Sequence, residues 1–136
     1  MSFKLTPDSP SEADIQAGIC QFLRSRHIPF SITDASRSFG PDGAPRRSKV
    51  TPGWPDLTAV IPFTGRALLI EVKSPEGRLR PVQSQVIEEL KAAGAVVVVA
   101  RSTREVEQAL EQAGCNYQTL LRWMNLCVRR RLHGAE

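Results

Sequence analysis

Residues 53–73 read GWPDLTAVIPFTGRALLIEVK, and this stretch decides the predicted fold. The apolar runs LTAVI and ALLIEV are separated by PFTGR, which is typical of two antiparallel strands joined by a short turn. Asp56 comes directly before the first run, whereas Glu71 and Lys73 lie at the end of the second. A hairpin of these strands therefore brings the three charged side chains to one end of a sheet.

The chemistry of these residues points to a metal site. Side chains alternate along a strand, so Glu71 and Lys73 share one face. Asp56 and Glu71 would bind a divalent cation together, with the backbone carbonyl of Val72 as a third oxygen ligand. Oxygen ligands favour Mg²⁺ or Mn²⁺, and the few histidines and cysteines show no zinc-ligand spacing.

Two carboxylates and an ammonium around such a cation are suited to hydrolysing a phosphodiester. Lys73 would orient the attacking water or stabilise the charge that develops in the transition state. A solvent-facing strand edge is the alternative explanation for a Glu-x-Lys pair. The apolar surroundings of Glu71 favour a site, because a buried carboxylate is costly unless it is paired or bound to a metal.

The composition bounds the kind of protein. With 136 residues, 41% of them hydrophobic and 24% charged, the chain has the size and make-up of a single compact domain. No apolar run approaches the length of a membrane span, and the polar N-terminus lacks the layout of a signal peptide. We therefore expect a soluble cytoplasmic protein without membrane contact. The net charge of +4 is compatible with nucleic acid as a partner.

The remaining segments predict an α/β fold, a small mixed sheet flanked by helices in the order α-β-β-β-α-β-α-α. Residues 1–10 form a loose arm and residues 34–53 an irregular loop. Residues 95–100 are apolar throughout, which is typical of a central strand covered on both faces. We expect helices over residues 12–26, 81–93, 103–113 and 117–132. The last of these is predicted to pack five side chains: Leu120, Leu121, Met124, Cys127 and Val128.

Two polar residues fall on apolar helix faces. Glu12 lies on the buried side of the first turn of its helix, where it either favours the positive helix end or reaches toward the metal site. Gln83 lies along the apolar face of its helix and is expected to point inward.

Basic residues flank the proposed carboxylate site in the sequence and are expected to contact nucleic-acid phosphates. They are Arg37, Arg46, Arg47, Lys49, Arg78 and Arg80. The triplet 129–131 is either a solvated helix face or a further phosphate contact.

The motif Pro55-Asp56…Glu71-Val72-Lys73 resembles the PD-(D/E)XK nuclease signature. With Gly53 before it and Gly77-Arg78-Leu79, Pro81-x-Gln83 and a helix ending at Gly94 after it, the set is similar to the VRR-NUC (virus-type replication-repair nuclease) domain over roughly residues 12 to 110. The resemblance implies a restriction-endonuclease-like fold that uses Mg²⁺ or Mn²⁺. It also implies that Glu12, Asp56 and Glu71 are acidic site residues, that Lys73 is catalytic and that Gln83 supports the site.

By this resemblance the chain is expected to be a stand-alone DNA endonuclease of a bacterial or phage-infected cell. Such a nuclease would act as a homodimer on branched DNA, like a Holliday-junction resolvase. A monomeric flap or nicking nuclease, a non-catalytic nucleic-acid-binding module and a purely structural protein are the alternatives. RNA stays open as a substrate.

Overall fold

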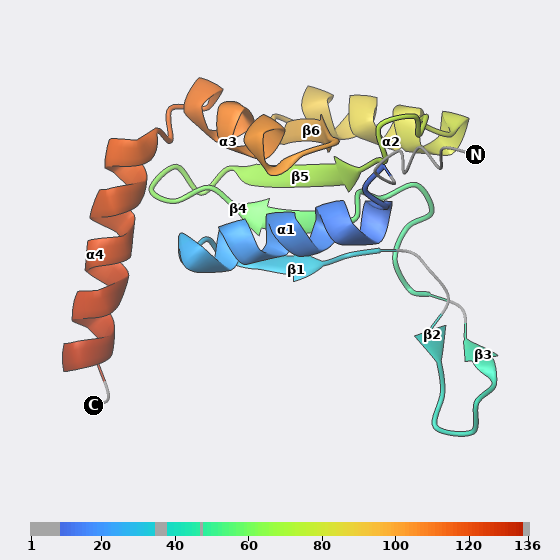
Figure 1. Ribbon diagram of the computed structural model, residues 1–136, viewed down its shortest axis with the longest axis horizontal. Helices are drawn as coiled ribbons and strands as arrows, with labels where there is room; N and C mark the ends of the chain where they lie inside the picture. Colours follow the sequence, from blue (N-terminus) through green and yellow to red (C-terminus); the bar gives the residue numbers. More distant parts are fainter. Residues whose placement is uncertain (1–8, 35–37, 47, 135–136) are drawn as a thin grey trace, which may run out of the picture.

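The structure is a computed structural model, which describes residues 9–34, 38–46 and 48–134 (Figure 1). Its helices are α1 (Glu12–Ser25), α2 (Pro81–Ala92), α3 (Thr103–Gln112) and α4 (Tyr117–His133). Its strands are β1 (Phe30–Ile32), β2 (Ser38–Phe39), β3 (Pro45–Arg46), β4 (Leu57–Val60), β5 (Ala67–Val72) and β6 (Val96–Ala100). The predicted α/β fold with a small mixed sheet is confirmed.

The main sheet has the strand order β1-β4-β5-β6. Strands β4 and β5 form the predicted antiparallel hairpin, with Leu57 opposite Ile70, and β1 pairs with β4 in the same sense. Strand β6 runs parallel to β5 after the crossover through α2. The two inner strands thus position the site: Asp56 directly precedes β4, Glu71 belongs to β5 and Lys73 directly follows it.

The prediction that residues 95–100 form a central strand was wrong, because β6 lies at the edge of the sheet. Most of its residues are only half-buried. The continuous valine run has a different cause: α3 contacts β6, and so does α2. Coverage of both faces, rather than a neighbour on both edges, explains the apolar sequence.

The core lies mainly between the sheet and α1, α3 and the first turn of α4. Alternate residues of β4 and β5, such as Leu57 and Ile70, pack there against Ile19, Leu23 and Leu110. Alternation sends Leu69 and Glu71 to the opposite face, where α2 lies. This division places Glu71 against a helix rather than against solvent.

Helix α1 begins where the sequence predicts. Ser11 and Asp14 form a reciprocal capping box, in which the Ser11 hydroxyl accepts from the Asp14 amide and the Asp14 carboxylate accepts from the Ser11 amide. This satisfies amides that the first turn leaves without helical partners. The helix runs from the end of the sheet that carries Asp56 toward α4 (Figure 1).

The prediction that residues 34–53 form an irregular loop was wrong in part, because the segment contains two short strands. Strands β2 and β3 pair in a separate antiparallel hairpin that projects from the body (Figure 1). Asp42 accepts a hydrogen bond from the Ala44 amide in its turn, a local contact that needs no periodic apolar pattern. The element order therefore gains two short strands.

Helix α4 is also packed less than predicted. Leu120 is its one buried residue among those described, and Val128 is 48% exposed. The helix projects beyond the body at the end opposite α2, so the described residues of its last turns are mostly exposed (Figure 1). None of the described helices has both the length and the apolar character needed to cross a membrane.

Candidate active site

Asp56 lies at the entrance to β4, where two backbone contacts fix its position. The Thr33 amide donates to the Asp56 carbonyl at 2.7 Å, which ties the residue to the end of β1. The Val72 amide donates to Asp56 Oδ2 at 2.7 Å. The carboxylate is thereby held at the end of β5, beside the Glu-x-Lys segment, as predicted from the hairpin.

Glu71 is only 1% exposed, and its two carboxylate oxygens have different surroundings. Oε1 accepts from Gln83 Nε2 at 2.9 Å and lies 3.5 Å from Lys73 Nζ. Oε2 is buried and receives no hydrogen bond from a donor group among the described residues. The neighbouring carboxyl of Asp56 is close enough to hydrogen-bond with Glu71 only when one of the two is protonated. Two buried carboxylates in contact are costly when both are ionised, and this favours a cation as their partner.

The electrostatics of the pair point the same way. Burial, followed by the adjacent charge of Asp56, raises the pKa of Glu71 to about 7 against the opposing ammonium of Lys73. Burial also raises the pKa of Asp56, although the hydrogen bond from the Val72 amide opposes this. When both carboxylates are ionised, the single ammonium of Lys73 neutralises only one of their two negative charges.

A hollow of about 530 Å³ opens beside Asp56 and Val72, and Glu12 lines it as well. Glu12 is exposed, so the prediction that it lies on the buried side of α1 was wrong. The turn at Gly77 lies near it, since a Cβ there would come within 3.3 Å of Glu12 Oε1. Among the described residues, no three His, Cys, Asp or Glu side chains converge as a ready metal cluster. Glu12 thus shares the hollow with Asp56 without joining it in such a cluster.

The N-terminal end of α2 supports the site from the other side. Gln83, which is buried as predicted, donates to Glu71 and accepts from the Arg80 amide at 2.9 Å. Gly53, just before Trp54-Pro55-Asp56, has φ +83° and packs so closely on this helix that a Cβ would lie 2.6 Å from the Val82 carbonyl oxygen. A glycine there lets the Pro-Asp turn approach α2.

Two residues at the site were missed in the sequence. Arg101, directly after β6, donates through Nη1 to the carbonyls of Ser74 and Gly77 and so holds the loop that follows Lys73. Asp34 lines the same hollow as Asp56, and its charge contributes to the raised pKa of Asp56. The pairing of β1 with β4 explains the second, because the residues after Ile32 must lie beside those before Leu57. No short-range pattern indicates Arg101.

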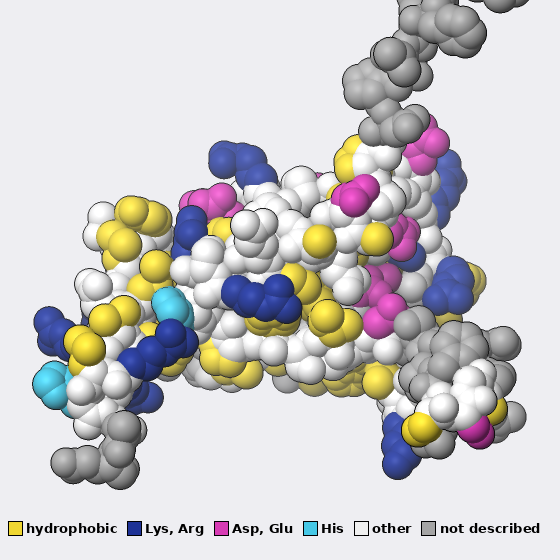
Figure 2. All heavy atoms as spheres, turned by 60° about the horizontal axis from the view of Figure 1, so that its bottom comes forward, with side chains coloured by type: hydrophobic (Ala, Val, Ile, Leu, Met, Phe, Trp, Pro, Cys, Tyr) yellow, Lys and Arg dark blue, Asp and Glu magenta, His cyan; other side chains and the backbone are white. Residues whose placement is uncertain are grey.

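The predicted basic residues are only partly placed. Lys49, Arg78 and Arg80 are exposed, and the last two lie in the segment between Lys73 and α2. Arg46 belongs to strand β3, whereas Arg37 and Arg47 lie outside the described residues. Acidic side chains gather at one end of the body in Figure 2, with Lys and Arg side chains nearby.

The fold and this cluster define a class: an α/β domain with two carboxylates, a lysine and a glutamine converging at the ends of an antiparallel hairpin. The VRR-NUC domain family matches residues 16–104, more than half of the chain. The chain belongs to this nuclease family. Comparison with curated proteins and with solved structures gave no match.

Proposed function

We propose that this chain is a metal-dependent DNA endonuclease whose active site comprises Asp56, Glu71 and Lys73. The observation that carries the proposal is the orphaned Oε2 atom of Glu71, buried beside a second carboxylate in a member of a nuclease family. A purely structural ion pair would satisfy that oxygen or leave it in solvent. The arrangement supports a site that is completed by a cation.

The donor set fits Mg²⁺ or Mn²⁺. Asp56, Glu71 and the carbonyl of Val72 would hold the ion, and Glu12 is available from the same hollow. All are oxygen donors, which hard divalent cations prefer. When bound, such a metal neutralises the scissile phosphate and lowers the pKa of a water ligand.

The other residues of the site prepare and support this chemistry. Lys73 is 8% exposed and is held beside Glu71, so its ammonium is positioned to orient water or stabilise charge on the reacting phosphate. Gln83 holds the Glu71 carboxylate through Oε1, which leaves Oε2 directed away from that contact. The carboxylates are thus fixed before the substrate arrives.

DNA is the substrate we propose, with branched DNA preferred. The exposed cations Lys49, Arg78 and Arg80 would contact phosphates close to the site, and we assign the same role to Arg37, Arg46 and Arg47. Such contacts position the backbone without reading its sequence, as a structure-selective enzyme requires.

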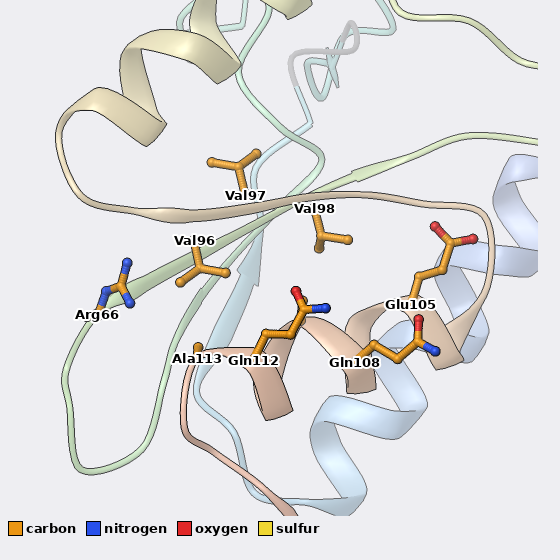
Figure 3. A pocket seen from close by; sticks show the side chains of 9 residues that line it. Arg66, Val96, Val97, Val98, Glu105, Gln108, Gln112 and Ala113 are labelled. Atoms are coloured by element: carbon orange, nitrogen blue, oxygen red, sulfur yellow. The ribbon is translucent and has the colours of Figure 1, made fainter.

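A homodimer is the proposed working form, and the edge strand β6 offers a self-complementary surface for it. A hollow of about 340 Å³ beside β6 is lined by Val96, Val97 and Val98, with Arg66 toward one end and Glu105 toward the other (Figure 3). Arg66 is held there by donating to the Gly94 carbonyl at 2.9 Å. Antiparallel pairing of two β6 strands would bring Arg66 of each copy toward Glu105 of the other.

Cleavage of a labelled panel tests the proposal: four-way junction, flap, nicked, single-stranded and plain duplex DNA, each with Mg²⁺, Mn²⁺ or EDTA. We expect metal-dependent cutting that Asp56→Asn and Lys73→Ala abolish and that Lys91→Ala, which changes an exposed lysine of α2, leaves intact. Preference for the junction supports the resolvase proposal, and preference for the flap or the nick supports the monomeric alternative. Binding without cutting under every metal condition would contradict catalysis, and cutting that survives both site substitutions would contradict the assigned site.

A further inference from the structure

Helix α4 projects from the body, but side-chain contacts fix its first half in place. Trp123 Nε1 donates to the carbonyl of His27 at 2.8 Å, directly after α1. The Trp123 ring meets Phe63 edge-to-face at 5.9 Å, and the Arg122 guanidinium lies 5.3 Å from the Phe63 ring centre. These contacts fix the first half of α4 against the body, while its later turns extend past it (Figure 1).

The projecting half of α4 is strongly cationic. The segment Tyr117–His133 contains no Asp or Glu, and its last turns carry Arg129, Arg130 and Arg131. Cations are favoured at a helix C-terminus, which alone would account for one or two of them. The helix end therefore does not account for all three arginines.

Two separate hollows along α1 share one lining arginine. A hollow of about 590 Å³ between the end of α1 and α4 is lined by Arg24, His27, Ile28, Cys127, Arg130 and Arg131. Arg24 also lines the hollow that contains Asp56. Arg24 thus borders both hollows, one beside the candidate active site and the other beside α4.

Small residues of α1 border the hollow on the active-site side of Arg24. On α1, the hollow that contains Asp56 is bordered by Ala13, Ala17 and Cys20, whose short side chains leave room beside the helix. In Figure 2, Lys and Arg side chains gather over α4, and acidic side chains gather at the other end of the same face. A polyanion lying on this face would have its reacting phosphate at the carboxylates and its distal phosphates at the arginines.

We infer that the backbone of a DNA duplex runs along α1 from Asp56 to α4, where Arg24, Arg130 and Arg131 bind its phosphates at a distance from the cut. The inference rests on the proposed function and adds the direction in which the bound DNA extends from the site. At 1.5 Å per residue, Glu12 to Arg24 spans about 18 Å, or about five base pairs of duplex. A duplex arm shorter than this cannot reach α4.

Duplex binding measured by fluorescence anisotropy tests this, in EDTA so that nothing is cut. The doubly substituted protein Arg130→Ala/Arg131→Ala should bind duplexes of about 16 base pairs roughly tenfold more weakly, with a salt slope smaller by about 2. Stem-loops with a stem of about 4 base pairs are shorter than the distance from the site to α4 and should lose less affinity in this variant than the longer duplexes do. The matched control Lys91→Ala/Arg104→Ala removes two exposed cations from α2 and α3 and should behave as wild type.

Cleavage by the same proteins separates the two proposals. If the wild type cuts DNA and the α4 variant binds long duplexes as the wild type does, the path along α1 is wrong and the nuclease proposal stands. If no protein cuts but the length-dependent loss appears, the path stands and the nuclease proposal fails. Arg130→Lys/Arg131→Lys should restore most of the affinity, and failure to do so would contradict a phosphate contact.

Discussion

Glu71 combines the features that make a site residue both costly and useful. Its carboxylate is buried, one oxygen is held by Gln83 and Lys73, and the other receives no hydrogen bond from a donor group among the described residues. The ionised carboxylate therefore bears an unfavourable desolvation that protonation or a bound cation would relieve. Such local strain is common where a protein gives up stability for function.

Replacing Glu71 by glutamine should raise stability while abolishing cleavage. The amide retains the shape of the side chain but removes a charge that burial disfavours, so we expect a metal-free gain of about 1–3 kcal/mol, or about 3–8 °C in Tm. Thermal unfolding in EDTA measures this. Glu76→Gln, at an exposed position, is the control and should leave Tm unchanged. A lower Tm for Glu71→Gln would contradict the view that the charge is poorly satisfied.

The pH dependence of metal-free stability should carry the signature of Glu71. Its pKa rises from 4.5 in the unfolded chain to about 7 in the fold, so the native state binds the proton more tightly. The contribution of Glu71 to stability is therefore full below pH 4.5 and is lost as the pH rises through about 7. Urea unfolding in EDTA at about pH 5 and about pH 8 should show a larger fall for wild type than for Glu71→Gln. Equal changes would mean that Glu71 is not perturbed.

At the residue level, sequence reasoning finds the side chains that interrupt a pattern. Glu71 stands out in an apolar strand, and Gln83 lies on the buried face of its helix. Glu12 shows the limit, because helical periodicity gives the direction of a side chain and not the point at which the core ends. Arg101 shows a second limit of sequence reasoning, since its contacts with Ser74 and Gly77 depend on where β6 ends beside β5.

Among the elements, the turn before β4 has a strict geometric requirement. Gly53 has a positive φ and contacts the first turn of α2, so Gly53→Ala should meet both backbone strain and a clash with the Val82 carbonyl. We expect a loss of about 2–4 kcal/mol, with reduced activity because Asp56 follows three residues later. Gly65→Ala is the matched control: its φ is +71°, but a Cβ there meets nothing within 4 Å. Equal losses in chemical denaturation would show that strain alone matters.

Strands and helices were predictable where local pattern and environment agree. The hairpin β4–β5, the capped start of α1 and the crossover through α2 follow from alternation, capping and turn residues. The position of β6 at the sheet edge does not follow from its sequence. An apolar run indicates that both faces of a strand are covered, but it does not indicate how many strands pair with it. The length of α4 was predictable, but its packing was not. Its apolar pattern continues to Val128, whereas the core that the helix contacts ends near Leu120.

For the whole molecule, the proposed homodimer can be tested at the edge strand β6. Val97→Lys places a charge on the proposed surface between copies and should convert a dimer to a monomer, because edge lysines disfavour strand pairing. Analytical ultracentrifugation measures this. Val60→Lys is the control, since Val60 is an exposed valine on β4 away from this hollow. A dimer that persists in Val97→Lys would place the contact elsewhere, and a monomeric wild type would remove the homodimer from the proposal.

The central claim is that Asp56 and Glu71 form a cation site, and calorimetric titration with Mn²⁺ tests it most directly. Wild type should bind Mn²⁺, whereas Asp56→Asn and Glu71→Gln should each lose at least about tenfold in affinity, since each removes an anionic ligand from a buried position. Lys91→Ala should bind as wild type does. Equal Mn²⁺ binding by wild type and both site variants, or none by any of them, would contradict the account.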